Sequence, residues 1–193
     1  MSEPRMQAGR KRSSDAHEAI IEATLATLGE VGFHQLTIEG VAARAGVAKA
    51  TVYRWWPSKA FLVLEVVSSQ LGEPMRPSGD SKQDVRAVVT IIVNMVSGMV
   101  GEVLLADVAR NPEAGQQLED LLGPYKAAHA SVLLAAAGRG ELPYDVDARK
   151  VLEWLTGIAL YYKVMNRALG THLIDELTGF VLSGTVPRLA PEV

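Results

Sequence analysis

The stretch from Thr37 to Lys59, TIEGVAARAGVAKATVYRWWPSK, constrains the fold of this chain more than any other. Thr37 suits the N-cap of a helix, because its hydroxyl can accept a hydrogen bond from a free backbone amide of the first turn. Gly46 suits the end of that helix, where a left-handed backbone is needed and glycine carries no Cβ penalty. Pro57 cannot continue a helix but is favoured at the first position of the next one. The pattern predicts helices over residues 37–45 and 49–56, a tight turn between them, and a third helix from residue 58.

The outer faces of the second predicted helix carry polar and cationic side chains, whereas Val52 is its inward residue. This arrangement predicts a helix-turn-helix, in which the second helix enters the major groove of DNA while the first crosses the backbone. A compact trio of structural helices is the alternative, because short helix pairs with a glycine turn are common. The upstream cluster Arg10–Arg12 favours DNA binding and would either follow a groove or form a disordered tail. The side chains expected to face DNA on this helix are Lys49, Thr51, Tyr53, Arg54 and Trp55.

The chain up to about residue 60 resembles the DNA-binding domain of the tetracycline-repressor (TetR) family. The resemblance implies phosphate contacts from Thr37, Tyr53 and Lys59. Lys49 and Thr51 are placed to reach base edges, with Arg54 or Trp55 assisting. The elements that carry the resemblance are the apolar helix 20–31, Gly32-Phe33, the helix 37–45, the turn Ala45-Gly46-Val47, the triplet Thr51-Val52-Tyr53, and Lys59.

Two positions depart from the family pattern. Ala48 stands where the family usually has a serine or threonine that caps the recognition helix, and losing such a cap costs about 1 kcal/mol of helix stability. No DNA contact is therefore expected from Ala48. Trp55 and Trp56 replace the commoner tyrosine or histidine and phenylalanine. We expect Trp56 in the core and Trp55 at the surface that faces DNA.

Charge and composition agree with a small DNA-reading domain joined to a larger bundle. The formal net charge is −3, but residues 1–60 carry a balance of +2 and the remainder a balance of −5. DNA affinity depends on the local patch and not on the whole-chain charge. The absence of cysteine excludes disulfides and thiolate metal sites. The charged amino terminus and the interrupted apolar run 85–100 predict a soluble cytoplasmic protein without a membrane span.

The rest of the chain shows helical spacing throughout and no convincing strand alternation, so we expect an all-α protein of about nine helices. The expected domains are residues 1–58, with 1–12 as a flexible basic arm, and residues 59–193. Ser81 with Asp84 predicts a capping-box-like helix start, and Gly123-Pro124 predicts a kink or break. The further helices expected cover residues 58–72, 81–100, 102–110, 112–137, 145 or 147 to 168, and 171–183.

The distal part resembles the ligand-binding and dimerisation domain of one branch of the same family. The marks are the segments 104–112, 138–142 and 157–162. The resemblance implies a homodimer in which the last two helices of each subunit pair across a two-fold axis. The alternative is that the apolar stripe of the last helix is core of a single chain. The stripe comprises Leu173, Ile174, Leu177, Phe180 and Val181.

An effector cavity is expected inside the distal bundle, with apolar walls and a few polar groups. For any single candidate, ordinary core is the stronger interpretation. Such a lining favours a small, lipophilic ligand, and no cofactor or metal is predicted. The candidate wall residues are Met95, Met99, Trp154, Tyr161 and Tyr162, with Asn94, Thr156 and Asn166 as polar groups.

The predicted function is a transcriptional repressor that binds a palindromic operator as a homodimer and is released by the effector. An enzyme is the rival class, but His17, His34, His129 and His172 show no metal-binding spacing and no nucleophile motif stands out. Each of these histidines is better explained as a surface residue or a satisfied core residue. An architectural DNA-binding protein without an effector is the second alternative.

Overall fold

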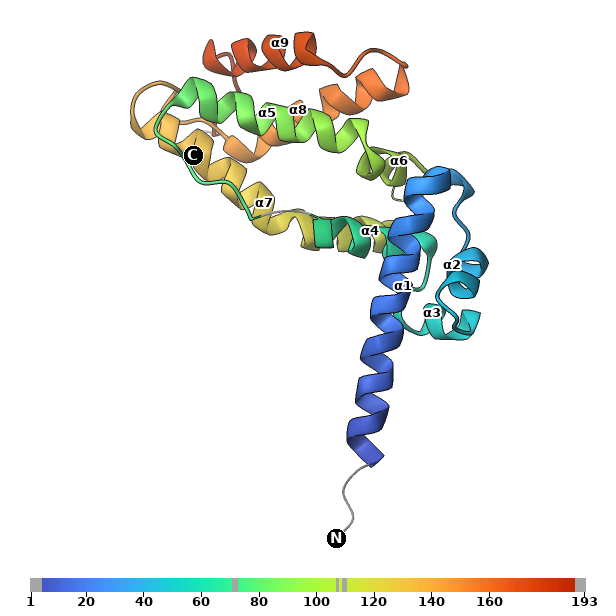
Figure 1. The fold of residues 1–193 in the computed structure, drawn as a ribbon. Coiled ribbons are helices and arrows are strands. Elements are labelled where there is room, and N and C mark those ends of the chain that lie inside the picture. Colours follow the sequence, from blue (N-terminus) through green and yellow to red (C-terminus); the bar gives the residue numbers. More distant parts are fainter. Residues whose placement is uncertain (1–4, 71–72, 107, 109–110, 190–193) are drawn as a thin grey trace. The chain divides into compact units, whose positions relative to one another are not determined.

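The computed structural model describes residues 5–70, 73–106, 108 and 111–189, and for residues 5–13, 70 and 104 it describes the backbone alone. These residues form nine α-helices and contain no strand, only an isolated bridge between Val146 and Arg188 (Figure 1). The expected all-α fold is confirmed. Backbone contacts divide the chain into two compact units, which are described separately. The first unit comprises Met1–Leu71 with Leu105–Gln117, and the second Gly72–Leu104 with Leu118–Val193.

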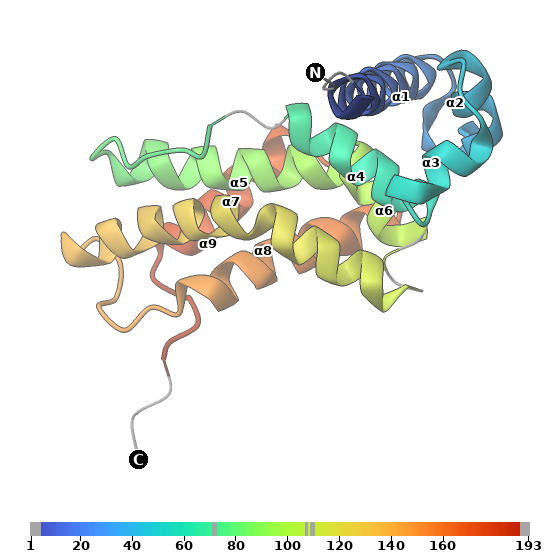
Figure 2. The same cartoon turned by 90° about the horizontal axis from the view of Figure 1, so that it is seen from below.

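The first unit holds α1 (Arg5–Gln35), α2 (Ile38–Arg44), α3 (Lys49–Trp55) and α4 (Lys59–Gln70), and its first three helices lie together in Figure 2. The helical backbone of α1 is interrupted at Gly32, which has a φ of 74°. α1 packs against α2 and α4, and α2 packs against α3. The buried side chains of this unit include Ile20, Phe33, Leu36, Val41, Val52, Trp56 and Leu62.

No side chain of the predicted basic arm, residues 1–12, is among the described side chains. Arg10–Arg12 belong to the part of α1 of which only the backbone is described, so their role stays a prediction. The backbone contacts group α4 with the first unit, whereas the sequence predicts a domain boundary after residue 58.

The second unit is built around α5 (Ser81–Ser97), which packs against α8 (Ala148–Val164) and α9 (Thr171–Leu182) (Figure 1). α6 (Met99–Ala106) and α7 (Pro112–Gly138) complete the helices, although the end of α6 and the start of α7 are grouped with the first unit. The apolar run in the sequence corresponds to the buried face of α5. Its buried apolar residues are Val85, Val88, Val89, Ile92, Val93 and Val96. No helix within the described residues is long and apolar enough to cross a membrane.

Several helix details differ from expectation: α6 spans Met99–Ala106 and not 102–110, and α8 ends at Val164 and not at 168. Asp80, and not Ser81, is the N-cap of α5, and its carboxylate accepts from the amide of Gln83 at 3.0 Å. α7 continues through Gly123-Pro124 without a break. Thr171 does not cap α9, because the N-cap position is Gly170.

Candidate DNA-reading surface and effector cavity

Thr37 fixes the start of α2 beside the predicted reading surface. Its Oγ1 accepts a hydrogen bond from the amide of Gly40 at 3.1 Å, as expected of an N-cap. The Thr37 hydroxyl acts there only as an acceptor and can still donate its own hydrogen. At the other end of α2, Gly46 has a φ of 67°, and the amide of Val47 donates to the carbonyl of Ala42 at 3.0 Å. This turn sets the direction of α3.

The outer face of α3 presents the predicted polar side chains. Lys49, Tyr53 and Arg54 are exposed, Thr51 is half-buried, and Val52 is fully buried beneath them. The helix therefore separates an exposed polar face from a core face, as the sequence predicts. Whether these side chains bind DNA stays a prediction.

Lys49 is engaged with Glu39 of α2, a contact that the sequence did not reveal. The Lys49 ammonium forms an ion pair with the Glu39 carboxylate and lies 5.4 Å from the centroid of the Tyr53 ring. The hydrogen bond from Lys49 lowers the pKa of Glu39, and the same bond raises the pKa of Lys49. Both groups are therefore charged at neutral pH and partly neutralise each other on the exposed surface.

Ala48 is the N-cap residue of α3 and provides no side-chain hydrogen bond, as its position in the sequence predicts. The amide of Thr51 donates instead to the backbone carbonyl of Ala48, at 2.8 Å. The recognition helix thus starts without the side-chain cap that a serine or threonine would supply.

The two tryptophans have different environments. Trp56 is 2% exposed, and its Nε1 donates to Glu65 Oε2 of α4 at 2.6 Å. His17 Nε2 lies 2.9 Å from the other oxygen of Glu65, and the His17 ring is 4.9 Å from the Trp56 ring. Trp55 is half-buried against His17, with the Arg54 guanidinium 4.8 Å from its ring centroid. Trp56 is confirmed as core, and His17 is a partner within this cluster.

Lys59 makes contacts within the first unit. Its Nζ donates to the carbonyl of Phe33 at 2.8 Å and lies 4.2 Å from the centroid of the Phe33 ring. Because Phe33 follows the interruption at Gly32, Lys59 ties the start of α4 to the end of α1. The predicted phosphate contact would have to use the remaining hydrogens of the ammonium group.

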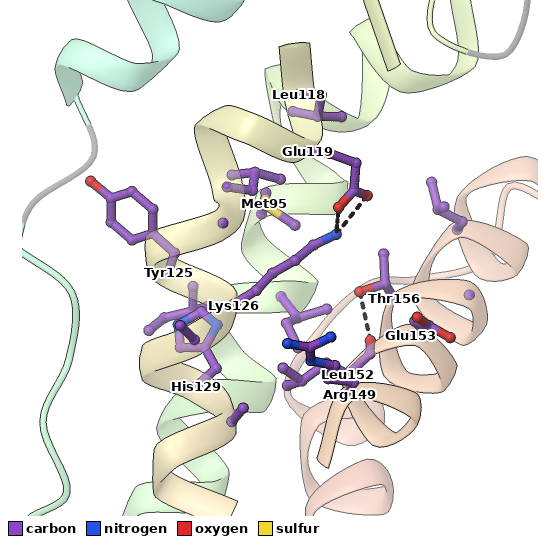
Figure 3. A pocket seen from close by; sticks show the side chains of 18 residues that line it. Met95, Leu118, Glu119, Tyr125, Lys126, His129, Arg149, Leu152, Glu153 and Thr156 are labelled. Atoms are coloured by element: carbon purple, nitrogen blue, oxygen red, sulfur yellow. Dashed lines mark hydrogen bonds and ion pairs between the residues drawn. The ribbon is translucent and has the colours of Figure 1, made fainter. Parts of the chain in front are cut away.

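The second unit contains a cavity of about 560 Å³, which we call the bundle cavity (Figure 3). Its walls come from α5, α7 and α8. Met95 and Thr156, both predicted from the sequence, lie on these walls. The other lining residues are Ile91, Ile92, Leu118, Glu119, Leu122, Gly123, Tyr125, Lys126, Ala127, His129, Ala130, Arg149, Leu152, Glu153, Gly157 and Leu160.

The remaining predicted pocket residues do not line the bundle cavity. Trp154 and Tyr161 are absent from the lining because of their position around the axis of α8. The lining residues of this helix include Arg149, Glu153, Thr156 and Leu160, which share one face, whereas Trp154 and Tyr161 lie on another. Trp154 is 51% exposed and Tyr161 is 53% exposed. Tyr162 stacks against Arg167, whose guanidinium is 4.0 Å from the ring centroid. Asn94, Met99 and Asn166 also lie outside the cavity lining.

Sequence reasoning missed the charged residues of the bundle cavity. Lys126 Nζ lies 2.6 Å from both carboxylate oxygens of Glu119 on the same helix (Figure 3). The Thr156 hydroxyl donates to the carbonyl of Leu152 at 2.8 Å. His129 is buried, and burial lowers the pKa of its imidazole from the ordinary value. No periodic signal distinguishes these positions from a solvated helix face.

The predicted dimer stripe is mostly buried within a single chain. Leu173, Ile174, Leu177 and Val181 are between 1% and 6% exposed and belong to the hydrophobic core of the second unit. Little of their surface is accessible to another chain. Their burial agrees with the alternative that the stripe belongs to the core of a single chain. Of the predicted set, Phe180 is exposed, at 38%.

A different apolar surface lies on the outside of α8 and α9, and we call it the α8–α9 surface. It comprises Trp154, Ile158, Tyr161 and Phe180. Trp154, Ile158 and Phe180 border one small hollow between the two helices, and Tyr161 is one helical turn beyond Ile158. Met165 continues the exposed apolar face of α8.

Comparison with known proteins agrees with both units. Residues 20–66 match the family described as bacterial regulatory proteins, tetR family, and residues 75–181 match the family described as tetracyclin repressor-like, C-terminal domain. An uncharacterized HTH-type transcriptional regulator of Mycobacterium tuberculosis is 30% identical over 175 residues, which cover 88% of this chain and 87% of the relative. A Bacillus subtilis regulator, YdeS, is 28% identical over 81% of this chain and 82% of its own length.

Solved structures share the fold. FadR of Thermus thermophilus, a TetR-family repressor solved with lauroyl-CoA, aligns with a TM-score of 0.64 and 18% identity, covering 92% of this chain and 98% of that one. FadR of Bacillus subtilis, solved with stearoyl-CoA, aligns with a TM-score of 0.59 and 20% identity over 86% and 98% of the two chains.

Within the described residues, no group of three histidine, aspartate or glutamate side chains could hold a metal ion. The chain belongs to the TetR family and is a DNA-binding transcriptional regulator and not an enzyme.

Proposed function

We propose that this regulator represses transcription by binding a palindromic operator as a homodimer, and that a small lipophilic effector releases it. The bundle cavity is the observation that carries the proposal. Its volume of about 560 Å³ falls within the range of small-molecule sites, and apolar side chains from three helices form most of its lining.

The reading of DNA is assigned to the exposed face of α3 and the start of α2. Thr37, Tyr53 and Lys59 would contact phosphates, and Lys49 and Thr51 would reach base edges, with Arg54 and Trp55 beside them. The exposure of Lys49, Tyr53 and Arg54 over the buried Val52 supports this division. Tyr53 is 44% exposed, so its ring and hydroxyl are accessible to a duplex.

The dimer interface is assigned to the α8–α9 surface in place of the buried stripe. Contiguous exposed aromatic side chains mark interaction sites on proteins, and tryptophan and tyrosine are enriched at the centres of interfaces. Two copies joined there would present two α3 helices to one operator. A two-fold operator with half-sites about 34–36 Å apart matches such a pair.

The lipophilic character of the effector follows from the cavity walls. Two solved relatives of the same fold are complexes with lauroyl-CoA and stearoyl-CoA, and the long acyl chains of these ligands agree with an apolar occupant. Ligand binding releases DNA only if the ligand prefers the spacing of the two readers that does not fit the operator. Equal affinity for both spacings would leave DNA binding unchanged.

The experiment has two stages. Genomic fragments retained by the purified protein are sequenced with and without small-molecule extracts, and binding to the strongest fragment is then measured by fluorescence anisotropy. The proposal expects a palindromic site, loss of binding in Tyr53→Ala with the dimer intact, and release by a lipophilic extract fraction. Broad affinity without sequence preference or ligand response would instead identify an architectural DNA-binding protein.

A further inference from the structure

His129 is unusual among the residues that line the bundle cavity. Among the described lining residues, it is the polar side chain that is more than nine-tenths buried, with 7% of its surface exposed. Across the described part of the chain, no hydrogen bond or ion pair involves its imidazole, and its ring nitrogens are not fully buried atoms without a partner, so they keep accessible surface. Because these nitrogens are accessible and His129 lines the cavity, a ligand oxygen there can form a hydrogen bond with the imidazole in place of water. His129 is therefore an available hydrogen-bonding partner in a cavity whose lining is mostly apolar.

The charges at the rim of the bundle cavity cancel. The charged lining residues are the two carboxylates Glu119 and Glu153 and the two cations Lys126 and Arg149, and all four side chains are exposed. Glu119 and Lys126 form an ion pair with each other. Glu153 follows Arg149 by four residues on the same face of α8, so its negative charge offsets the field of the guanidinium. The rim has no net positive charge with which to hold a polyanion.

The interior does not favour an anion either. Burial lowers the pKa of His129, so the imidazole is neutral at physiological pH and offers one N–H donor and one acceptor nitrogen. A carboxylate placed among the apolar walls would lose its hydration without gaining a full positive charge. A ketone, ester or alcohol oxygen needs only the hydrogen bond that a neutral imidazole supplies.

We infer that the effector is an uncharged lipophile whose single hydrogen-bonding oxygen is bound by His129, with its hydrocarbon part against the walls from α5, α7 and α8. The inference rests on the proposed function of the bundle cavity and adds the chemistry of the ligand's polar end. It separates this chain from its solved relatives with acyl-CoA ligands, whose head group carries several negative charges.

The test uses four probes with closely matched alkyl chains: methyl octyl ketone, decanol, decanoate and decanoyl-CoA. Their affinities for the full-length protein are measured by isothermal titration calorimetry at neutral pH. The ketone and the alcohol are expected to bind about tenfold or more tightly than the two anions. His129→Leu should weaken ketone binding by roughly tenfold, the effect of one lost hydrogen bond, and His129→Gln should retain most of it because the amide can also donate.

A change at the rim gives an independent measurement. Glu153→Gln should increase the affinity for decanoate, because it leaves Arg149 uncompensated, while ketone binding stays constant. Glu22→Gln on α1 makes the same charge change at a residue that does not line the cavity and should alter neither affinity.

Three results would overturn the inference. Decanoate or decanoyl-CoA could bind at least as tightly as the ketone, in which case the cavity is an effector site but the polar end is anionic. His129→Leu could bind the ketone as tightly as the unchanged protein, which would remove His129 from the site. If none of the four probes bound, both the inference and the lipophilic effector proposed above would fall, while the reading of DNA by α3 would stand.

Discussion

The carboxylate of Glu39, in the first turn of α2, forms an ion pair with the ammonium of Lys49, the first residue of α3. The pair joins the two helices of the helix-turn-helix across the surface that we assign to DNA. In the absence of DNA it keeps one of the predicted reading cations occupied. It also places a negative charge close to Thr37, which is expected to contact phosphate.

Glu39→Gln is expected to strengthen binding to non-specific duplex DNA. The substitution frees Lys49 to neutralise one further phosphate and removes a carboxylate that repels the backbone. The slope of log affinity against log salt should become steeper by about 0.9. Fluorescence anisotropy with a random-sequence duplex, between about 50 and 200 mM salt, measures the slope. Glu22→Gln, an exposed glutamate on α1, is the charge-matched control, and a Glu39→Gln slope equal to the control would contradict the prediction.

Ala48→Ser is expected to stabilise the first unit. A serine hydroxyl at the N-cap of α3 can accept from the amide of Thr51, a bond that alanine cannot provide. The free energy of unfolding should rise by about 1 kcal/mol, measured by urea denaturation. Ala50→Ser is the matched control: it introduces the same side chain inside the helix, where serine costs a few tenths of a kcal/mol. An equal effect of the two substitutions would remove the capping explanation.

His129 is expected to make stability depend on pH. Its pKa is lowered by burial below the ordinary value of 6.5, so the unfolded chain binds the proton more readily than the folded one. Stability from the neutral imidazole is therefore present above pH 6.5 and is lost as the pH falls through that value towards the lower folded pKa. Chemical denaturation at a series of pH values measures the loss, and His129→Gln should lack this component. Parallel curves for the two proteins would be evidence against it.

Trp154→Glu is expected to dissociate the proposed dimer. Trp154 lies at the hollow between α8 and α9 with 51% of its surface exposed, so a carboxylate there should not disturb the core of one chain. The dimer dissociation constant should rise about 30-fold or more if Trp154 is an anchor of the interface. Sedimentation equilibrium measures this constant. Tyr144→Glu changes an aromatic side chain that is 91% exposed and should leave association unchanged. Equal dimer strength in both variants would argue for a different interface.

Gly101→Ala is expected to destabilise the second unit. A Cβ at this position of α6 would lie 1.8 Å from the carbonyl oxygen of Val96, at the end of α5. Because that atom is backbone, relief requires the joint between the two helices to move, at a cost of about 1–3 kcal/mol. Gly29→Ala on α1 meets nothing within 4 Å and should instead gain about 0.5–1 kcal/mol. The two changes, compared by thermal or urea unfolding, should have opposite signs.

The first unit could be predicted closely because its signals are local. Thr37 caps α2, Gly46 adopts the left-handed turn, and Trp56 is buried, each as the sequence indicates. These features depend on a residue and its neighbours within one or two turns. The Glu39–Lys49 pair could not be predicted in this way, because it depends on the angle between two helices.

The helical fold of the second unit could be predicted from the sequence. Which neighbour each helix face contacts could not. The stripe through Leu173 and Leu177 has the same spacing whether it meets α5 of its own chain or a partner, and in the structure it meets α5. On α8, a rotation of about half a turn separates Trp154 from the cavity-lining Thr156. Periodicity shows that a helix is amphipathic, whereas only the packing shows which neighbour each face has.

α8 contributes to the core through Val151 and Leu155, to the bundle cavity through Thr156, and to the α8–α9 surface through Trp154. Few of its positions are therefore available for change without a second effect. Anyone who wishes to retune the ligand preference of this regulator as a biosensor should begin on α7. There, Leu122 and His129 face the cavity from a helix that contributes nothing to the proposed partner surface.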